Sequence, residues 1–245
     1  MRNIKLIIEY DGGRYDGWQR LGKEESKNTV ENKIIEVLEK LTSTSVELFA
    51  GMRTEKGVHA HYQVANFKTD ILLKPIEIRN YLNRYLPMDI AVVSVSDEHE
   101  RFHSALNAKS KTFLYRIDVR DVYNVFDRKY TYYSFAKLDI DKMKKVAECF
   151  IGEHDFKAFS TAKKNKNTIK TVQSIDIYGD NEEISITVKA NDYLHNMARL
   201  IIGALIEAGN GRVSAKDIEA MLKGDKELTI LPAETNGMFL ENIEY

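Results

Sequence analysis

The first hundred residues alternate between short apolar runs, which predict strands, and apolar positions repeated at helical spacing. The apolar runs fall at residues 5–10, 46–50, 63–67 and 90–95. The helical spacing covers residues 29–41, and Asn28 before it suits a helix N-cap. A second helix is expected from Pro75, a residue favoured in the first helical turn, to about Leu86. This order predicts helices packed on one face of a mainly antiparallel sheet.

The rest of the chain shows the same alternation of predicted strands and helices, without an obvious sequence repeat. Strands are expected at residues 113–119, 175–178, 184–188 and 239–243, and helices at about 139–150, 193–208 and 214–222. The helix at 193–208 is the most apolar, and the glycines at 209 and 211 should end it, since glycine favours helix C-termini. We therefore predict an α+β protein with two similar domains, residues 1–100 and 101–245.

A polar turn, Arg53-Thr54-Glu55-Lys56-Gly57, joins two of the predicted strands. It places the carboxylate of Glu55 on a tight turn, two residues from Arg53. Rigid strands that present a polar loop are a common way to position reactive groups. The same residues are also typical of a simple solvated turn, so the pattern alone leaves both interpretations open.

Composition narrows the classes of protein that the sequence can encode. The chain has 245 residues, 36 basic and 37 acidic, a balance that neither indicates nor excludes a nucleic-acid binder. Its single cysteine, Cys149, excludes an internal disulfide and suits a reducing cytoplasm. The N-terminus lacks the apolar run of a signal peptide, and no stretch approaches the length of a membrane span. We expect a soluble, cytoplasmic protein that does not associate with membranes.

The sequence carries no signature of a cofactor. Among the six histidines only His59 and His61 are near neighbours, and no cysteine pattern joins them into a zinc site. Neither a glycine-rich phosphate loop nor a nucleophile elbow is present. We therefore predict a protein that needs neither a metal ion nor an organic cofactor.

Lysines crowd one polar segment in the second half of the chain. They are Lys157, Lys163, Lys164, Lys166 and Lys170. A segment of this kind is often only a solvated loop. As an RNA contact it would bind phosphates and confer little sequence preference. Both interpretations remain open at this point.

Short motifs recur in a fixed order along nearly the whole chain. In the first half they are Tyr10-Asp11-Gly12, Gly17-Trp18-Gln19-Arg20, Arg53-Thr54, Gly57-Val58-His59-Ala60, Gln63-Val64-Ala65, Leu86-Pro87 and Phe102-His103. In the second half they are Gly152-Glu153-His154-Asp155-Phe156, Leu194-His195-Asn196-Met197 with Arg199, and Pro232-Ala233. A single match would be weak. Together, in this order, the motifs resemble the tRNA pseudouridine synthase A family.

The resemblance implies two related α+β domains that flank a positively lined cleft and assemble as a homodimer. It implies a reaction that converts uridine to pseudouridine in the anticodon arm of tRNA, without metal or cofactor. By position, Glu55 would be the catalytic carboxylate and Arg199 its partner, whereas Phe113 would stack on the target base. Arg53 and His59, in the active-site loop, are candidates for contact with tRNA. Further contacts would come from Lys163, Lys164 and Lys166.

The chain departs from the family pattern around the expected chemical centre. Glu55 stands where the family has Asp, Phe113 where it has Tyr, and Ala105 where it usually has Arg. Lys56, which replaces Ala, could replace some of the charge lost at Ala105, or could pair with Glu55 and hold it out of line. The stem of Glu is longer by one carbon, about 1.5 Å, and a misplacement near 1 Å can cost on the order of a hundredfold in rate. Two hypotheses follow: an active synthase, and a catalytically impaired paralogue that still binds tRNA.

Overall fold

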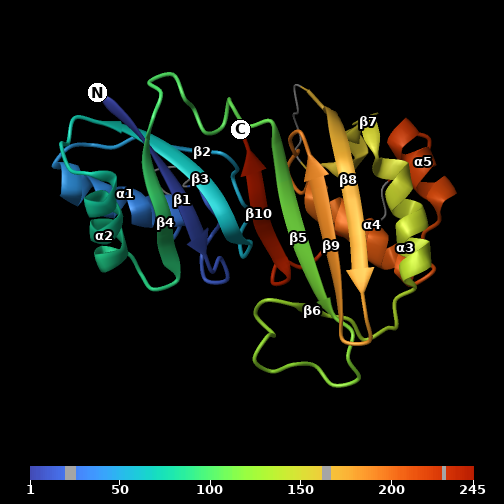
Figure 1. Cartoon of the computed structure of the whole chain (residues 1–245). Coiled ribbons are helices and arrows are strands. Elements are labelled where there is room, and N and C mark those ends of the chain that lie inside the picture. Colours follow the sequence, from blue (N-terminus) through green and yellow to red (C-terminus); the bar gives the residue numbers. More distant parts are fainter. Residues whose placement is uncertain (20–25, 162–166, 228–229) are drawn as a thin grey trace. The chain divides into compact units, whose positions relative to one another are not determined.

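The computed structural model of the protein describes residues 1–19, 26–161, 167–227 and 230–245. They form two compact units, and each is described by itself below (Figure 1). The first unit contains residues 1–109 and 239–245, and the second contains residues 110–238. The division made from the sequence, at residue 100, differs because it assigns residues 101–109 and the last strand to the second domain.

The sheet of the first unit is built around β1 (Arg2–Tyr10). β1 pairs antiparallel with β3 (His59–Thr69) on one side and with β4 (Ile90–Glu98) on the other. β2 (Leu48–Ala50) pairs antiparallel with β3, whereas β10 (Met238–Glu244) pairs with β3 in parallel. The predicted antiparallel core is confirmed. The parallel pairing of β10 joins the last strand of the chain to the strand that follows the Glu55 turn.

Two helices accompany this sheet, α1 (Val30–Thr42) and α2 (Pro75–Tyr85), and α2 packs against both β4 and α1. Proline opens α2, as predicted. The N-cap of α1 is Thr29, whose hydroxyl accepts a hydrogen bond from the third helical residue at 3.3 Å. The prediction of Asn28 as this cap is therefore wrong. The Asn28 side chain is engaged elsewhere, because its amide donates to the carbonyl of Arg14 at 2.7 Å.

The sheet of the second unit has the strand order β5–β9–β8–β7. Its strands are β5 (Ser110–Asp118), β9 (Glu183–Ala190), β8 (Ile169–Gly179) and β7 (Gly152–Asp155), all paired antiparallel. A short strand, β6 (Tyr132–Tyr133), pairs in parallel with β5. The predicted hairpin of β8 and β9 is confirmed, whereas β6 and β7 were not expected, since neither has an alternating apolar pattern.

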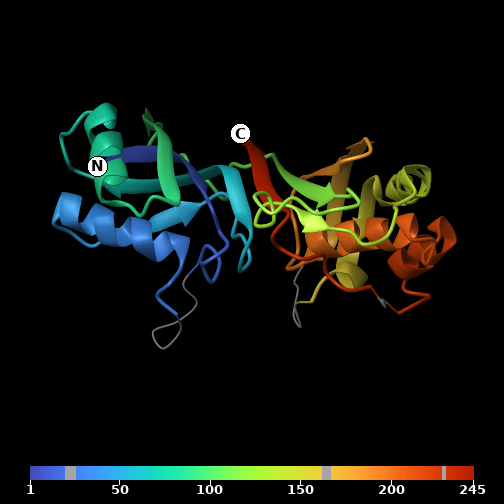
Figure 2. The same cartoon turned by 90° about the horizontal axis from the view of Figure 1, so that it is seen from below.

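The helices of the second unit are α3 (Ile140–Ala147), α4 (Met197–Gly209) and α5 (Ala215–Lys223). Two short 3-10 turns, η1 (Glu148–Phe150) and η2 (Phe156–Phe159), flank β7. Figure 2 shows α4 and α5 on the same side of the sheet. Nearly every residue of α4 is buried, as its apolar sequence predicts, so α4 is the central helix of this unit.

The helix ends show how local sequence sets these boundaries. Ser214 and Asp217 form a reciprocal capping box at the start of α5, the helix predicted over residues 214–222. The expected start of α4 at residue 193 is wrong by four residues, because Asn196 has a left-handed backbone with φ of 62° and cannot continue a helix. No helix formed by the described residues is long and apolar enough to cross a membrane. The architecture confirms the α+β class.

Candidate functional site

The loop that carries Glu55 is anchored at its start by Gln63. This side chain is fully buried on β3. Its amide nitrogen donates to the carbonyl of Met52 at 2.7 Å, and its oxygen accepts from the Met52 nitrogen at 3.3 Å. The nitrogen of Gly51 also donates to the carbonyl of Val64 at 2.7 Å. The loop therefore leaves the sheet at a fixed point, directly before Arg53.

The segment that follows β1 braces the middle of the loop. Thr54 is held twice, because its hydroxyl bonds the Tyr10 hydroxyl at 2.7 Å and its carbonyl accepts from the Trp18 nitrogen at 3.0 Å. On the other side of the turn, the nitrogen of Gly57 donates to the carbonyl of Tyr15 at 3.3 Å. Hydrogen bonds before and after Glu55 thus fix the backbone on which its carboxylate stands.

Two glycines allow this segment to approach the loop closely. A Cβ on Gly17 would lie 2.9 Å from the carbonyl oxygen of Thr54 and 3.2 Å from the carbonyl carbon of Glu55. The φ of Gly17, 92°, is also one that other residues rarely adopt. A Cβ on Gly12 would overlap the backbone carbonyl of Val58. The motif residues of this segment therefore serve to hold the loop.

Glu55 stands at the turn itself. Its carbonyl accepts a hydrogen bond from the Val58 nitrogen at 3.1 Å, and its side chain is partly exposed. Lys56 pairs with Asp16 at 2.8 Å, and this hydrogen bond holds the pKa of the Asp16 carboxyl below its usual range. The hypothesis that Lys56 pairs with Glu55 is therefore wrong. Arg53 is exposed and forms no ion pair with any residue that the structure describes.

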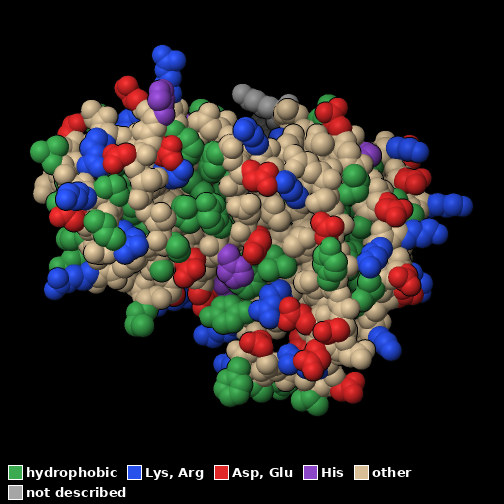
Figure 3. Space-filling view, viewed as in Figure 1, with side chains coloured by type: hydrophobic (Ala, Val, Ile, Leu, Met, Phe, Trp, Pro, Cys, Tyr) green, Lys and Arg blue, Asp and Glu red, His purple; other side chains and the backbone are tan. Residues whose placement is uncertain are grey.

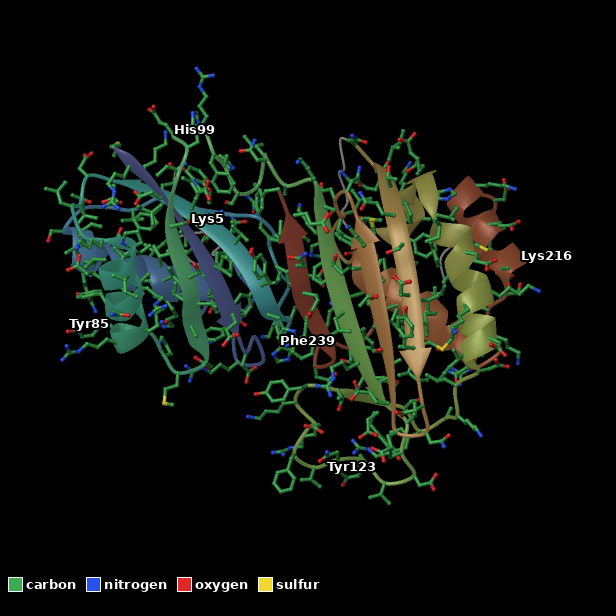
Figure 4. All side chains as sticks on the ribbon, viewed as in Figure 1. Lys5, Tyr85, His99, Tyr123, Lys216 and Phe239 are labelled. Atoms are coloured by element: carbon green, nitrogen blue, oxygen red, sulfur yellow. The ribbon has the colours of Figure 1, made fainter. Side chains whose placement is uncertain are left out.

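His59 is buried at the start of β3, with 1% of its surface exposed. The backbone N–H of Gly12 donates to its Nδ1 at 3.1 Å, and its ring stacks on Phe239, which Figure 4 labels, with centroids 4.9 Å apart. An Asp11 oxygen also lies 3.0 Å from Nδ1. His59 therefore supports the loop, and its contact with a substrate stays a prediction.

In the second unit, Arg199 lies in the first turn of α4 and is held by Ala233. Its Nε donates to the carbonyl of Ala233 at 2.7 Å, and its backbone carbonyl accepts from the Ala233 nitrogen at 3.0 Å. Gly203, one turn later, permits this contact, since a Cβ there would overlap the carbonyl of Leu231. A cation near a helix N-terminus is unfavourable by roughly 0.3–1 kcal/mol. The position of Arg199 therefore suits chemistry better than stability.

Phe113 lies on β5 and is buried, with 4% of its surface exposed. Its ring meets the ring of Tyr193 edge-on, with centroids 5.1 Å apart. The Tyr193 hydroxyl donates to the carbonyl of Val188 at 2.7 Å, and burial raises the pKa of that hydroxyl well above its ordinary value. The aromatic ring at position 113 is thus held in a fixed orientation. Its stacking on a base stays a prediction.

Comparison with curated proteins identifies relatives over the full length of the chain. The tRNA pseudouridine synthase A 2 of Bacillus anthracis is 42% identical over 247 residues, which cover 100% of both chains. The tRNA pseudouridine synthase A of Bacillus sp. (strain KSM-64) is 44% identical over 246 residues, with the same coverage. The chain belongs to the tRNA pseudouridine synthase A family. A family model described as tRNA pseudouridine synthase matches residues 146–245.

Similarity to solved structures is much weaker. A chain of the archaeal box H/ACA sRNP Nop10–Cbf5 complex is 12% identical with a TM-score of 0.39, covering 95% of this chain and 61% of that one. A chain of a Cbf5–Nop10–Gar1 complex is 13% identical with a TM-score of 0.36, covering 83% and 44%. This chain therefore spans less than two thirds of either. Likenesses of this size support no argument about function.

Membership of the tRNA pseudouridine synthase A family gives the motifs a shared physical meaning. Residues of the motifs at Tyr10, Gly17-Trp18 and Gln63 contact the Glu55 loop in the first unit. In the second unit, Asn196 and Ala233 of the late motifs accept hydrogen bonds from Arg199. Sequence reasoning recognised these motifs but missed what they do, because their partners are far apart in the chain. Within the described residues, no three His, Cys, Asp or Glu side chains are grouped so that they could hold a metal ion.

The structure describes only part of the lysine-rich segment, residues 157–170. Lys163, Lys164 and Lys166 lie outside the described residues, so their predicted role stays a prediction. Next to them in the sequence, Lys170 pairs with Asp192 at 3.1 Å, and Lys111 of β5 pairs with the same carboxylate at 2.6 Å. Burial alone would raise the pKa of Asp192, but the two lysines together lower it. Lys111 is itself buried, so this ion pair holds Asp192 against β5.

Proposed function

We propose that this protein isomerises uridine to pseudouridine in the anticodon arm of tRNA. Full-length identity of 42% and 44% to tRNA pseudouridine synthases A supports the proposal. The observation that carries it is the bracing of the Glu55 loop, in which hydrogen bonds and two close glycine contacts fix the backbone around one carboxylate. A merely solvated turn would need no such support.

The proposed chemistry assigns a role to each of three side chains. The carboxylate of Glu55 attacks or deprotonates the nucleotide, so that the bond from the base nitrogen to the ribose breaks. The base then rotates and rejoins the ribose through carbon, and no atoms are gained or lost overall. By the family resemblance, Arg199 is the proposed partner of this carboxylate. Phe113 would stack on the base after it leaves its own stack.

The direct test is chemical mapping of pseudouridine in tRNA incubated with the wild type and with Glu55 variants. Glu55→Ala should abolish product while tRNA binding persists, because binding rests on phosphate contacts. Glu100→Ala, which removes an exposed carboxylate of the same unit, is the matched control and should leave product formation unchanged. If the wild type binds tRNA but forms no pseudouridine, the enzyme hypothesis fails and the binding paralogue is the better description.

We also propose that the tRNA backbone contacts Lys163, Lys164 and Lys166. Lys170, four residues beyond Lys166 in the sequence, supports this, because Lys170 and the buried Lys111 together outnumber the single carboxylate of Asp192 that they share. Phosphate contacts of this kind position an RNA without reading its sequence. Since tRNA is the proposed substrate, the protein would act in the cytoplasm.

A homodimer is the proposed assembly, and one loop of the second unit supports it. The segment between β5 and α3 exposes five large apolar side chains: Val122, Tyr123, Val125, Phe126 and Phe135. Phe126 is 88% exposed and Phe135 95% exposed. Figure 3 shows apolar side chains at this end of the molecule, where Figure 4 labels Tyr123. Clustered exposed apolar residues commonly mark a protein–protein contact.

A further inference from the structure

A chain of three side-chain hydrogen bonds ends on Arg199. The Nη1 of Arg199 lies 3.0 Å from Oδ1 of Asn196. The Nδ2 of Asn196 lies 2.6 Å from the hydroxyl of Thr161, and that hydroxyl lies 2.6 Å from Nδ1 of His195. The Thr161 nitrogen also donates to the carbonyl of His195 at 3.3 Å. The chain thus joins the segment after η2 to the start of α4.

The direction of two of these hydrogen bonds follows from the chemistry of the partners. A guanidinium can only donate, so Asn196 must turn its oxygen toward Arg199 and its NH₂ toward Thr161. The Thr161 oxygen then accepts from Asn196. Between Thr161 and His195 either atom can be the donor, according to the tautomer of the imidazole, because the hydroxyl has a second lone pair. Arg199 thus fixes the orientation of the Asn196 amide, which in turn donates to Thr161.

The backbone of Asn196 shows that this arrangement is specific. Asn196 holds φ at 62°, a conformation that costs most residues roughly 1–2 kcal/mol, and it stands directly before α4. Its side chain makes no N-cap hydrogen bond, which is the usual role of Asn at that position. It bonds Arg199 and Thr161 instead. If Asn196 served only to start α4, we would expect its side chain to form the N-cap hydrogen bond.

We propose that His195, Thr161 and Asn196 are positioning residues that hold the guanidinium of Arg199 in place. The inference rests on the proposed function for its catalytic meaning, because Arg199 matters to the reaction only if Glu55 does. His195 and Thr161 are exposed, whereas Arg199 is partly buried. The hydrogen bonds therefore connect the partly buried guanidinium of Arg199 to two side chains at the protein surface.

Two variants of Thr161 separate positioning from packing. Thr161→Val keeps the shape and removes the hydroxyl, whereas Thr161→Ser keeps the hydroxyl. With saturating tRNA, Thr161→Val should lower kcat about tenfold, a loss that a shift of a few tenths of an ångström can produce. Thr161→Ser should retain the wild-type kcat. The Kd for tRNA should stay within about twofold in both. A rise in Kd with unchanged kcat would overturn the proposal and make Thr161 a direct RNA contact.

Variants of the two flanking residues extend the test. Asn196→Gly keeps the left-handed backbone and removes the amide, so it should lower kcat without lowering the unfolding midpoint. His195→Asn places an acceptor near the position of Nδ1, whereas His195→Gln places it near Nε2. The Asn variant should therefore retain more kcat than the Gln variant. Equal kcat values for these two variants would argue against a functional hydrogen bond between Thr161 and the side chain at position 195.

A measurement that does not depend on activity completes the test. The Nη1 protons of Arg199, which donate to Asn196, give NMR signals of the guanidinium group at low temperature, and Arg199→Lys would identify them. Thr161→Val should speed the hydrogen exchange of these signals, and Thr161→Ser should not. Unchanged exchange in Thr161→Val and Asn196→Gly would overturn the proposal. If exchange follows the expected pattern but the wild type forms no pseudouridine, the positioning network stands and the proposed function alone fails.

Discussion

Replacement of Gly17 by Ala should both destabilise the first unit and slow the reaction. A Cβ at this position would lie 2.9 Å from the Thr54 carbonyl oxygen and 3.2 Å from the Lys56 nitrogen. Real Cβ contacts are essentially never shorter than about 3.0 Å in packed interiors, where overpacking shifts the backbone. Because both contacts are to backbone atoms, no side chain can rotate to relieve them. The Glu55 turn itself must move.

The expected loss of stability in Gly17→Ala has two contributions. A left-handed φ costs an alanine roughly 1–2 kcal/mol, and the close contact adds about 1–3 kcal/mol for an overpacked site. Gly224 isolates the first part, because its φ is 79° and a Cβ there would meet open space at the end of α5. Gly224→Ala should therefore destabilise the protein less than Gly17→Ala, and the difference measures the contact with the loop.

Urea unfolding provides the measurement. Circular dichroism reports on both units, and the fluorescence of Trp18, the single tryptophan, reports on the first. Gly17→Ala should lower the midpoint of the fluorescence transition. It should also lower pseudouridine formation by up to about a hundredfold, since a shift near 1 Å at a reacting group has that effect. Gly224→Ala should leave product formation unchanged.

One result would refute this reasoning. If Gly17→Ala and Gly224→Ala lower stability equally and neither changes product formation, the close approach of Gly17 does not hold the Glu55 turn. The bracing would then be packing without consequence for the chemistry.

Three further predictions concern RNA, assembly and metals. Replacing Lys163, Lys164 and Lys166 by Ala should flatten the slope of log affinity against log salt by up to about three phosphate contacts; an unchanged slope would place the RNA elsewhere. Light scattering should give twice 28.2 kDa for the wild type, and Phe126→Ser with Phe135→Ser should shift it to the monomer; a dimer that survives both changes would exclude this loop as the contact. Pseudouridine formation should survive chelation, because a carboxylate mechanism needs no metal; loss that one divalent ion restores would contradict it.

The sequence was sufficient to predict those features that depend on residues close together in the chain. The proline that opens α2 and the β8–β9 hairpin each depend on residues a few positions apart, and both were predicted. The cap of α1 was missed by one residue, because Asn28 and Thr29 are both good caps and only a distant partner, Arg14, decides between them. The parallel pairing of β10 with β3 is likewise a long-range contact that no local pattern encodes.

In the candidate site, too, the contacts between residues far apart in the chain could not be predicted from the sequence. The motifs around Tyr10 and Gly17 could be recognised from the sequence, but the contacts that connect them with Thr54 span about forty residues of chain. The same holds for Arg199, since its hydrogen bond to Ala233 joins α4 to a segment beyond α5. Sequence patterns therefore located the residues of the site. The structural role of each residue became clear only from the residue that it contacts.

This bracing also decides which way a Glu55→Asp substitution should act. If the loop had shifted to suit the longer side chain, the backbone would have to retreat by about one bond length, roughly 1.5 Å. Thr54 is held on one side by the Tyr10 hydroxyl and the Trp18 nitrogen, and Gly57 on the other by the Tyr15 carbonyl. A retreat of that size would break these hydrogen bonds, each worth about 0.5–1.5 kcal/mol. We infer that the turn has not retreated and that the extra carbon of Glu55 is accommodated in the side chain. We expect Glu55→Asp to raise the rate of pseudouridine formation at saturating tRNA, with unchanged affinity. A lower rate would mean that the site has adapted to the longer side chain by some other movement.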